Sequence, residues 1–144
     1  MAETATPGWR WRARVTEAMI RLALARLLVT RIPLRRWSGI LGPINLVPSA
    51  GGGADDATRL LARAVTRGAA RLPFETKCLP RAIALHTLLR RSGRTSQLVI
   101  GVLGSRTRSS KQGSLEDLHA WVETHGEIII GALDEPFHPL VRFG

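Results

Sequence analysis

The stretch that decides the fold is CLPRAIALHTLLRRSG at residues 78–93, followed after three residues by QLVIGVL at Gln97–Leu103. Apolar side chains recur at helical spacing in the first segment, and Pro80 falls in the first turn, where amide protons lack partners anyway. Gly93 is a typical stop signal for a helix. In the second segment Val, Ile and Leu predominate, as in strands. The sequence therefore predicts a helix over residues 78–92 and a strand directly after it.

Two further helices are expected upstream of this segment. Residues 14–30 carry apolar side chains close to the spacing of one helical face, and the proline of RIPLRRW (residues 31–37) ends this helix in a basic turn. Residues 39–53 are rich in glycine and are expected to form a loop. A second apolar stripe begins at the acid pair of residues 55–56, which favours a helix N-terminus, and ends at Pro73.

Downstream, the pattern predicts extended structure. Residues 104–113 are polar and indicate a loop, and Leu118–Thr124 and Glu127–Ile130 read as strands joined by a tight turn at His125 and Gly126. Helices therefore come first and an antiparallel sheet follows, which is an α+β arrangement.

The length of 144 residues and the hydrophobic fraction of 44% fit one domain with its own core. We expect an N-terminal helical part over about residues 9–72 and a core over about residues 73–144. No apolar run approaches the roughly 20 residues of a membrane span, and the N-terminus lacks the pattern of a signal peptide. The expected location is the cytoplasm.

The single cysteine, Cys78, falls at the start of the predicted third helix. One thiol excludes an intramolecular disulfide, a CxxC redox pair and a thiolate-rich zinc site. Unpaired amide groups and the helix dipole stabilise an anion at this position, and His119 lies on a strand of the sheet that follows. A histidine that faces such a thiol activates it. Cys78 is the candidate nucleophile and His119 its base; the alternative is a buried packing cysteine.

The other histidines are interpreted as solvent-exposed or packing residues: His86, His125 and His138. No pair of histidines has the ligand spacing of a helix or a hairpin with acids nearby, so we predict no metal and no cofactor. Trp121 shares the parity of His119 along its strand and is expected on the same face, as a wall of the site or as a packing residue.

Three segments, in this order, carry a resemblance: CLPRAIALHTLLRRSG (residues 78–93), QLVIGV (residues 97–102) and LHAWVETHG (residues 118–126). They resemble the nucleophile helix, the first core strand and the histidine strand of the lasso peptide maturation proteases, called B proteins, of the transglutaminase-like superfamily. RIPLRRW and the RLPFETKC that leads to the cysteine are similar too. The resemblance covers most of the chain.

The resemblance implies a papain/transglutaminase-like core, with N-terminal helices followed by a nucleophile helix that packs on a small antiparallel sheet. It implies a cysteine peptidase that removes the leader from a ribosomally synthesised lasso precursor peptide before macrocyclisation. It also implies two partner proteins, a small leader-binding protein and an ATP-using lasso cyclase. The basic segment RIPLRRW is a candidate docking site for one of them.

The third member of the triad departs from the family, which usually has an aspartate where this chain has Gly131. Pairing across the tight turn would put Ala132 opposite His119 and Asp134 diagonally beside it. We therefore expect Asp134 to be the orienting acid. Glu123 belongs to the WVE motif and is interpreted as structural, and a Cys-His dyad without an acid is the remaining alternative.

Two other functions stay open. Acyl transfer to an amine instead of water would use the same residues. A non-catalytic module could instead use the net charge of +10 to bind an acidic peptide or nucleic acid. Nucleic-acid binding has little support, because the chain shows no helix-turn-helix, zinc-finger or RNP pattern.

Overall fold

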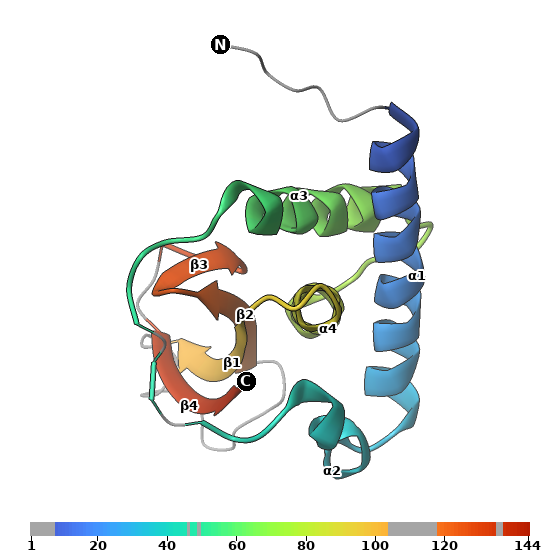
Figure 1. Ribbon diagram of the computed structural model, residues 1–144. Helices are drawn as coiled ribbons and strands as arrows, with labels where there is room; N and C mark the ends of the chain where they lie inside the picture. Colours follow the sequence, from blue (N-terminus) through green and yellow to red (C-terminus); the bar gives the residue numbers. More distant parts are fainter. Residues whose placement is uncertain (1–7, 46, 49, 104–117, 135–136) are drawn as a thin grey trace.

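Figure 1 shows the computed structural model, with the helices gathered on one side and a curved sheet on the other. The structure describes residues 8–45, 47–48, 50–103, 118–134 and 137–144. Helices precede a four-stranded antiparallel sheet, so the α+β prediction is confirmed. The loop expected at residues 104–113 lies outside the described residues.

The helical elements are α1 (Gly8–Arg31), α2 (Leu34–Trp37), the 3-10 helix η1 (Ser38–Leu41), α3 (Asp56–Arg71) and α4 (Cys78–Arg91). The helices expected around α3 and α4 are confirmed within a residue or two at each end. α1 begins earlier than expected, because the residues before position 14 are helical as well. Trp11, in this first part of the helix, packs against the core. No helix among the described residues is both long and apolar enough to cross a membrane.

The prediction of a simple basic turn at residues 31–37 was wrong. Leu34–Trp37 forms a helical turn that continues into η1. Trp37 is buried and its indole N–H donates to the carbonyl of Ile32 at 3.0 Å, while Leu41 is fully buried. Tertiary burial of these two side chains stabilises a segment that is too short to be helical by itself.

The strands are β1 (Gln97–Leu103), β2 (Leu118–Thr124), β3 (Glu127–Ile130) and β4 (Phe137–Phe143), in the sheet order β3-β2-β1-β4. The first three strands were predicted, and β4 was not. Pro139 interrupts the strand pattern of β4, but proline is tolerated because β4 lies at the edge of the sheet.

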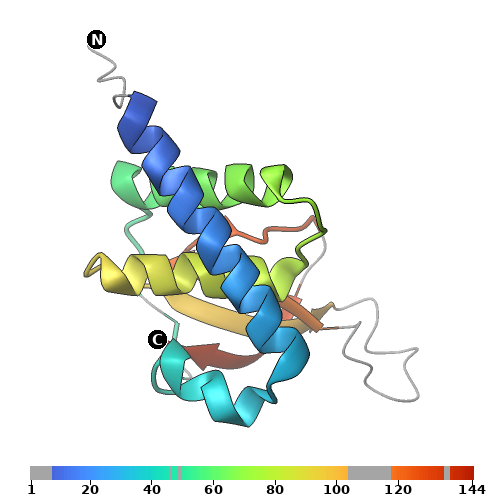
Figure 2. The ribbon, with the colours of Figure 1, turned by 90° about the vertical axis from the view of Figure 1, so that its right-hand side faces the viewer.

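The core lies between the helices and one face of the sheet. α4 occupies its centre and contacts α1 and α3 on one side and β1 and β2 on the other. Figure 2 shows α1 crossing in front of α3 and α4, with the sheet behind them. Leu85 and Leu89 of α4 are fully buried, and truncation of such a leucine to alanine costs about 2–5 kcal/mol. The element that begins with the cysteine is therefore firmly held by the core.

Candidate active site

Cys78 is the first residue of α4, and its free thiol is half-buried against the hydrophobic core. Lys77 precedes it in extended conformation and forms no side-chain hydrogen bond to cap the helix. Arg81 lies one turn further along and donates from Nε to the hydroxyl of Thr76 at 3.2 Å. The thiol thus lies beside helix amides without a side-chain cap and between two basic residues in the sequence.

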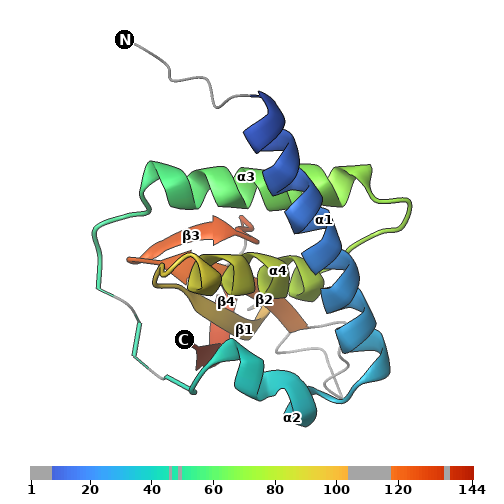
Figure 3. The same ribbon diagram turned by 45° about the vertical axis from the view of Figure 1, so that its right-hand side comes forward.

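The path of the chain brings the start of α4 and the start of β2 to the same end of the molecule. After α4 the chain reverses at Gly93, and β1 runs back along the helix. β2 pairs antiparallel with β1, so that His119, near the start of β2, lies opposite Gly101, near the end of β1. Figures 2 and 3 show both starts at this end. Cys78 and His119 therefore come from elements whose starts lie at the same end of the molecule. Ala120 and Val122 are the residues of β2 in the core that faces the helices, so His119, which alternates with them, lies on the other face of the strand.

His119 is half-buried, and its ring makes a hydrogen bond and an aromatic contact. Nε2 lies 2.6 Å from the backbone carbonyl oxygen of Gly131. The ring also stacks on Trp121, with 6.0 Å between the ring centroids and 22° between the planes. Trp121 thus shares the face of His119, as its parity predicted.

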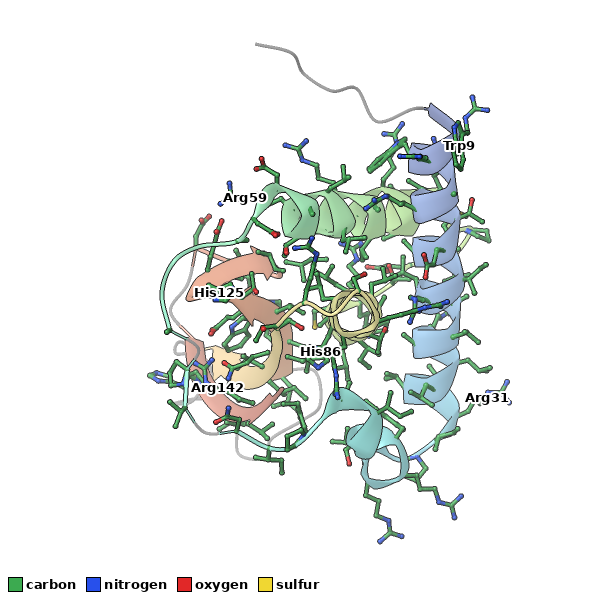
Figure 4. The ribbon with its side chains drawn as sticks, viewed as in Figure 1. Trp9, Arg31, Arg59, His86, His125 and Arg142 are labelled. Carbon is green, nitrogen blue, oxygen red and sulfur yellow. The ribbon has the colours of Figure 1, made fainter. Side chains whose placement is uncertain are left out.

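Glu123, the third residue on this face of β2, connects Trp121 to the far edge of the sheet. Its carboxylate accepts from the indole N–H of Trp121 at 2.7 Å and from Arg142 of β4 at 2.6 Å. The side chains of Glu123 and Arg142 are only 13% and 12% exposed, and Figure 4 shows Arg142 within the curve of the sheet. The pair therefore spans β1 and holds the indole on which His119 stacks.

The pairing expected between β2 and β3 was wrong by one residue. Glu123 pairs with Ile128 but Val122 pairs with Ile130, so the ladder shifts by one residue at Ile129. The shift allows both Ile129 and Ile130 to pack against the core. The register that placed Ala132 opposite His119 does not form.

Asp134 lies in the bend after β3, and its side chain is exposed. The corrected register removes the argument that set this carboxylate diagonally beside His119. Nε2 of His119 instead donates to the carbonyl of Gly131, at the position where the resemblance leads one to expect an acid.

The three other histidines lie on other elements of the fold. His86 is fully buried in α4, where Nδ1 lies 2.7 Å from the hydroxyl of Ser96 and Nε2 lies 2.7 Å from the carbonyl of Leu41. Burial lowers the pKa of His86, and Figure 4 shows the ring between α4 and the helical turns that follow α1. His125 is exposed in the β2–β3 turn and His138 is exposed on β4. Among the described residues no group of His, Cys, Asp and Glu side chains is arranged to hold a metal ion.

Residues 24–142 match the family model of the transglutaminase-like superfamily, and this span contains α4 and the whole sheet up to Arg142. The chain belongs to the transglutaminase-like superfamily. Members of this superfamily are usually cysteine peptidases or acyltransferases, and Cys78 and His119 both lie within the matched span. No curated protein and no solved structure matches the chain.

Sequence reasoning missed two groups at this site, the carbonyl of Gly131 and the guanidinium of Arg142. The carbonyl belongs to the backbone and has no signature in the sequence. Arg142 lies on β4, the strand that sequence analysis did not identify. The alternation of β2 was the usable signal, because it placed Trp121 and Glu123 on the face of His119.

Proposed function

We propose that this member of the transglutaminase-like superfamily is a cysteine peptidase that removes the leader from a lasso precursor peptide before macrocyclisation. The observation that carries the proposal is the position of the single cysteine, at a helix start without a side-chain cap, at the end of the molecule where the histidine strand begins. The superfamily supports the reaction class. The substrate rests on the resemblance of the three segments that contain Cys78, the core strand and His119.

In the proposed reaction the thiol of Cys78 gives its proton to His119, and Sγ attacks the scissile carbonyl carbon. The oxyanion is held by backbone N–H groups at the start of α4, where Cys78 and Leu79 carry an N–H and Pro80 does not. His119 then returns the proton to the leaving amine, and water releases the peptide from the thioester.

The leader-binding partner is proposed to dock on the basic segment that joins α1 to η1. Its residues 31–36 are exposed and include three arginines with Ile32 and Leu34, whereas Trp37 is buried and anchors the segment. Exposed apolar side chains among cations suit an amphipathic, acidic surface on the partner. Presentation of the leader by this partner raises the effective concentration of the scissile bond, so the isolated protein is expected to be only weakly active.

Cleavage of a lasso precursor peptide, followed by mass spectrometry with and without the leader-binding partner, tests the proposal. Wild-type protein should release the intact leader, faster when the partner is present, and His119→Ala should release none. Full activity on the precursor alone would remove the need for the partner. Addition of a primary amine separates hydrolysis from acyl transfer, because a transferase yields the amide of the leader instead of the free acid.

Thiol alkylation separates the peptidase from a non-catalytic basic module. An activated Cys78 should react with iodoacetamide well below pH of about 8.5, where an ordinary thiol is mostly protonated. His119→Ala should slow this reaction. Alkylation that follows the profile of an ordinary thiol and is unchanged by His119→Ala would favour the binding module.

A further inference from the structure

We infer that the backbone carbonyl of Gly131 orients the imidazole of His119 and fixes which of its ring nitrogens carries the proton. The inference deepens the proposed function and rests on it for the consequence in catalysis, although the hydrogen bond itself does not depend on it. Gly131 is then a positioning residue, because it acts through His119 and does not touch the substrate.

The hydrogen bond fixes which ring nitrogen carries the proton. A carbonyl oxygen only accepts, so at 2.6 Å from the Gly131 oxygen the Nε2 of His119 must donate. In the neutral ring the other nitrogen, Nδ1, then holds the lone pair. In the proposed reaction Nδ1 is then the ring nitrogen that can take the proton of the Cys78 thiol.

The carbonyl is fixed by a backbone that suits glycine. Gly131 has φ +86°, a conformation that residues with a side chain rarely adopt. A Cβ at this position would lie 2.8 Å from the carbonyl oxygen of Ala120 and 2.9 Å from the Cβ of Trp121, both too close. An aspartate at this position would therefore not fit the backbone as it stands, and the carbonyl supplies the acceptor instead.

Trp121 adds a second restraint on the ring. The indole lies nearly parallel to the imidazole of His119 and is itself held by the carboxylate of Glu123. Stacking sets the plane of the imidazole, and the Gly131 carbonyl sets its rotation within that plane. When His119 becomes an imidazolium, Nε2–H keeps its bond to a neutral acceptor, which stabilises the cation less than a carboxylate would.

The first test reads the tautomer directly, by NMR of Cys78→Ala protein with ¹⁵N-labelled histidine rings. The chain has four histidines, and the signals lost in His119→Gln are those of His119. We expect neutral His119 to carry its proton on Nε2. A proton on Nδ1 would overturn the inference. This measurement needs no turnover, so it decides the question even if the protein proves not to cleave a precursor.

The second test moves the carbonyl. Gly131→Ala introduces both the strain and the clash, and Gly93→Ala is its matched control, since Gly93 also has positive φ but open space around a Cβ. We expect Gly131→Ala to lose about 10- to 100-fold in kcat, the range for one hydrogen bond to a charged group, and to lose its tautomer preference. Activity and tautomer equal to those of Gly93→Ala would refute the role of the carbonyl.

The third test asks whether Asp134 holds the role instead. Asp134→Asn should leave the rate within a few fold and the tautomer unchanged. Loss of a true triad acid costs on the order of 10⁴ in rate. A loss of that size in folded Asp134→Asn protein would return the role to Asp134 and contradict the inference, and this outcome remains decisive if Gly131→Ala fails to fold.

Discussion

The starts of α3 and α4 differ, although both helices are of similar length and pack against each other. Asp55 caps α3: its carboxylate accepts from the backbone N–H of Thr58 at 2.8 Å and also binds Arg94. The corresponding position of α4 is Lys77, which makes no cap, and the next residue is Cys78. α3 satisfies its first amides with its own side chain, and α4 does not.

The capped start of α3 contributes to stability, whereas the uncapped start of α4 leaves its amides available for the proposed reaction. A cap on α4 would add stability, but it would occupy the amides that the proposed mechanism reserves for a thiolate and an oxyanion. α4 compensates through its position between the other helices and the sheet, with Leu85 and Leu89 fully enclosed. α3 is more amphipathic, with its arginines exposed.

The largest contrast should come from the first residue of each helix. Cys78→Ala should abolish cleavage, a loss of about 10⁴-fold or more, because the nucleophile is removed. Asp56→Ala, at the first position of α3, should leave cleavage within a few fold. Circular dichroism of both variants checks the fold, and cleavage retained in Cys78→Ala would end the peptidase assignment.

Transfer of the acidic cap from α3 to α4 should sharpen the comparison. In Lys77→Asp the new carboxylate binds the first amides of α4 and repels the thiolate of Cys78. We expect the free energy of unfolding to rise by about 1 kcal/mol and the alkylation rate of Cys78 to fall about tenfold. Lys77→Ala is the control, since it removes the positive charge without adding a cap. Equal alkylation rates in the two variants would show that the amides do not act on the thiol.

Removal of the cap from α3 should lower the stability of the protein and leave its cleavage activity nearly unchanged. Asp55→Ala leaves the N–H of Thr58 without its acceptor and frees Arg94, so Tm should fall by about 3–6 °C. Cleavage should stay within a few fold at temperatures where the protein is folded. A large loss of activity at unchanged Tm would contradict the separation of the two helix starts.

The smallest effect concerns the charge on the α3 cap. The hydrogen bonds from Thr58, and then the one from Arg94, lower the pKa of Asp55 from 3.8 to about 2. Because the folded-state pKa is the lower one, the ionised carboxylate stabilises the fold above about pH 3.8, and this contribution is lost as pH falls toward 2.

Asp55→Asn keeps a capping oxygen but loses the charge, so it isolates this effect. Wild-type protein should melt slightly above the variant near neutral pH, and the difference should vanish in melts taken as the pH approaches 2. A difference that persists unchanged through the acidic range would show that the charge of Asp55 contributes nothing.

Most of the fold was predictable because periodicity is local. The apolar stripes of α3 and α4 and the extended runs of β1, β2 and β3 are each readable within one element. Two parts depend on distant contacts instead. η1 and the turn before it form because Trp37 and Leu41 are buried, and β4 forms by pairing with β1 in spite of Pro139.

The site was predictable in part for the same reason. The position of Cys78 at a helix start and the shared face of His119 and Trp121 follow from local patterns, and both agree with the structure. The pairing of β3 with β2 does not follow from local patterns. A run of identical isoleucines has no alternation that could fix the shift at Ile129. The carbonyl of Gly131 became visible only with that pairing.

The buried imidazole of His86 gives the molecule an internal reporter of opening. Its Nε2 donates to the carbonyl of Leu41, so this proton joins α4 to η1. Exchange of the proton with solvent requires η1 to lift away from the helix, and its rate therefore measures how often that happens. The proposed docking segment, residues 31–36, leads directly into η1 through Trp37. Slower exchange of this one proton when the leader-binding partner is added would register docking from inside the core, without a label on the surface.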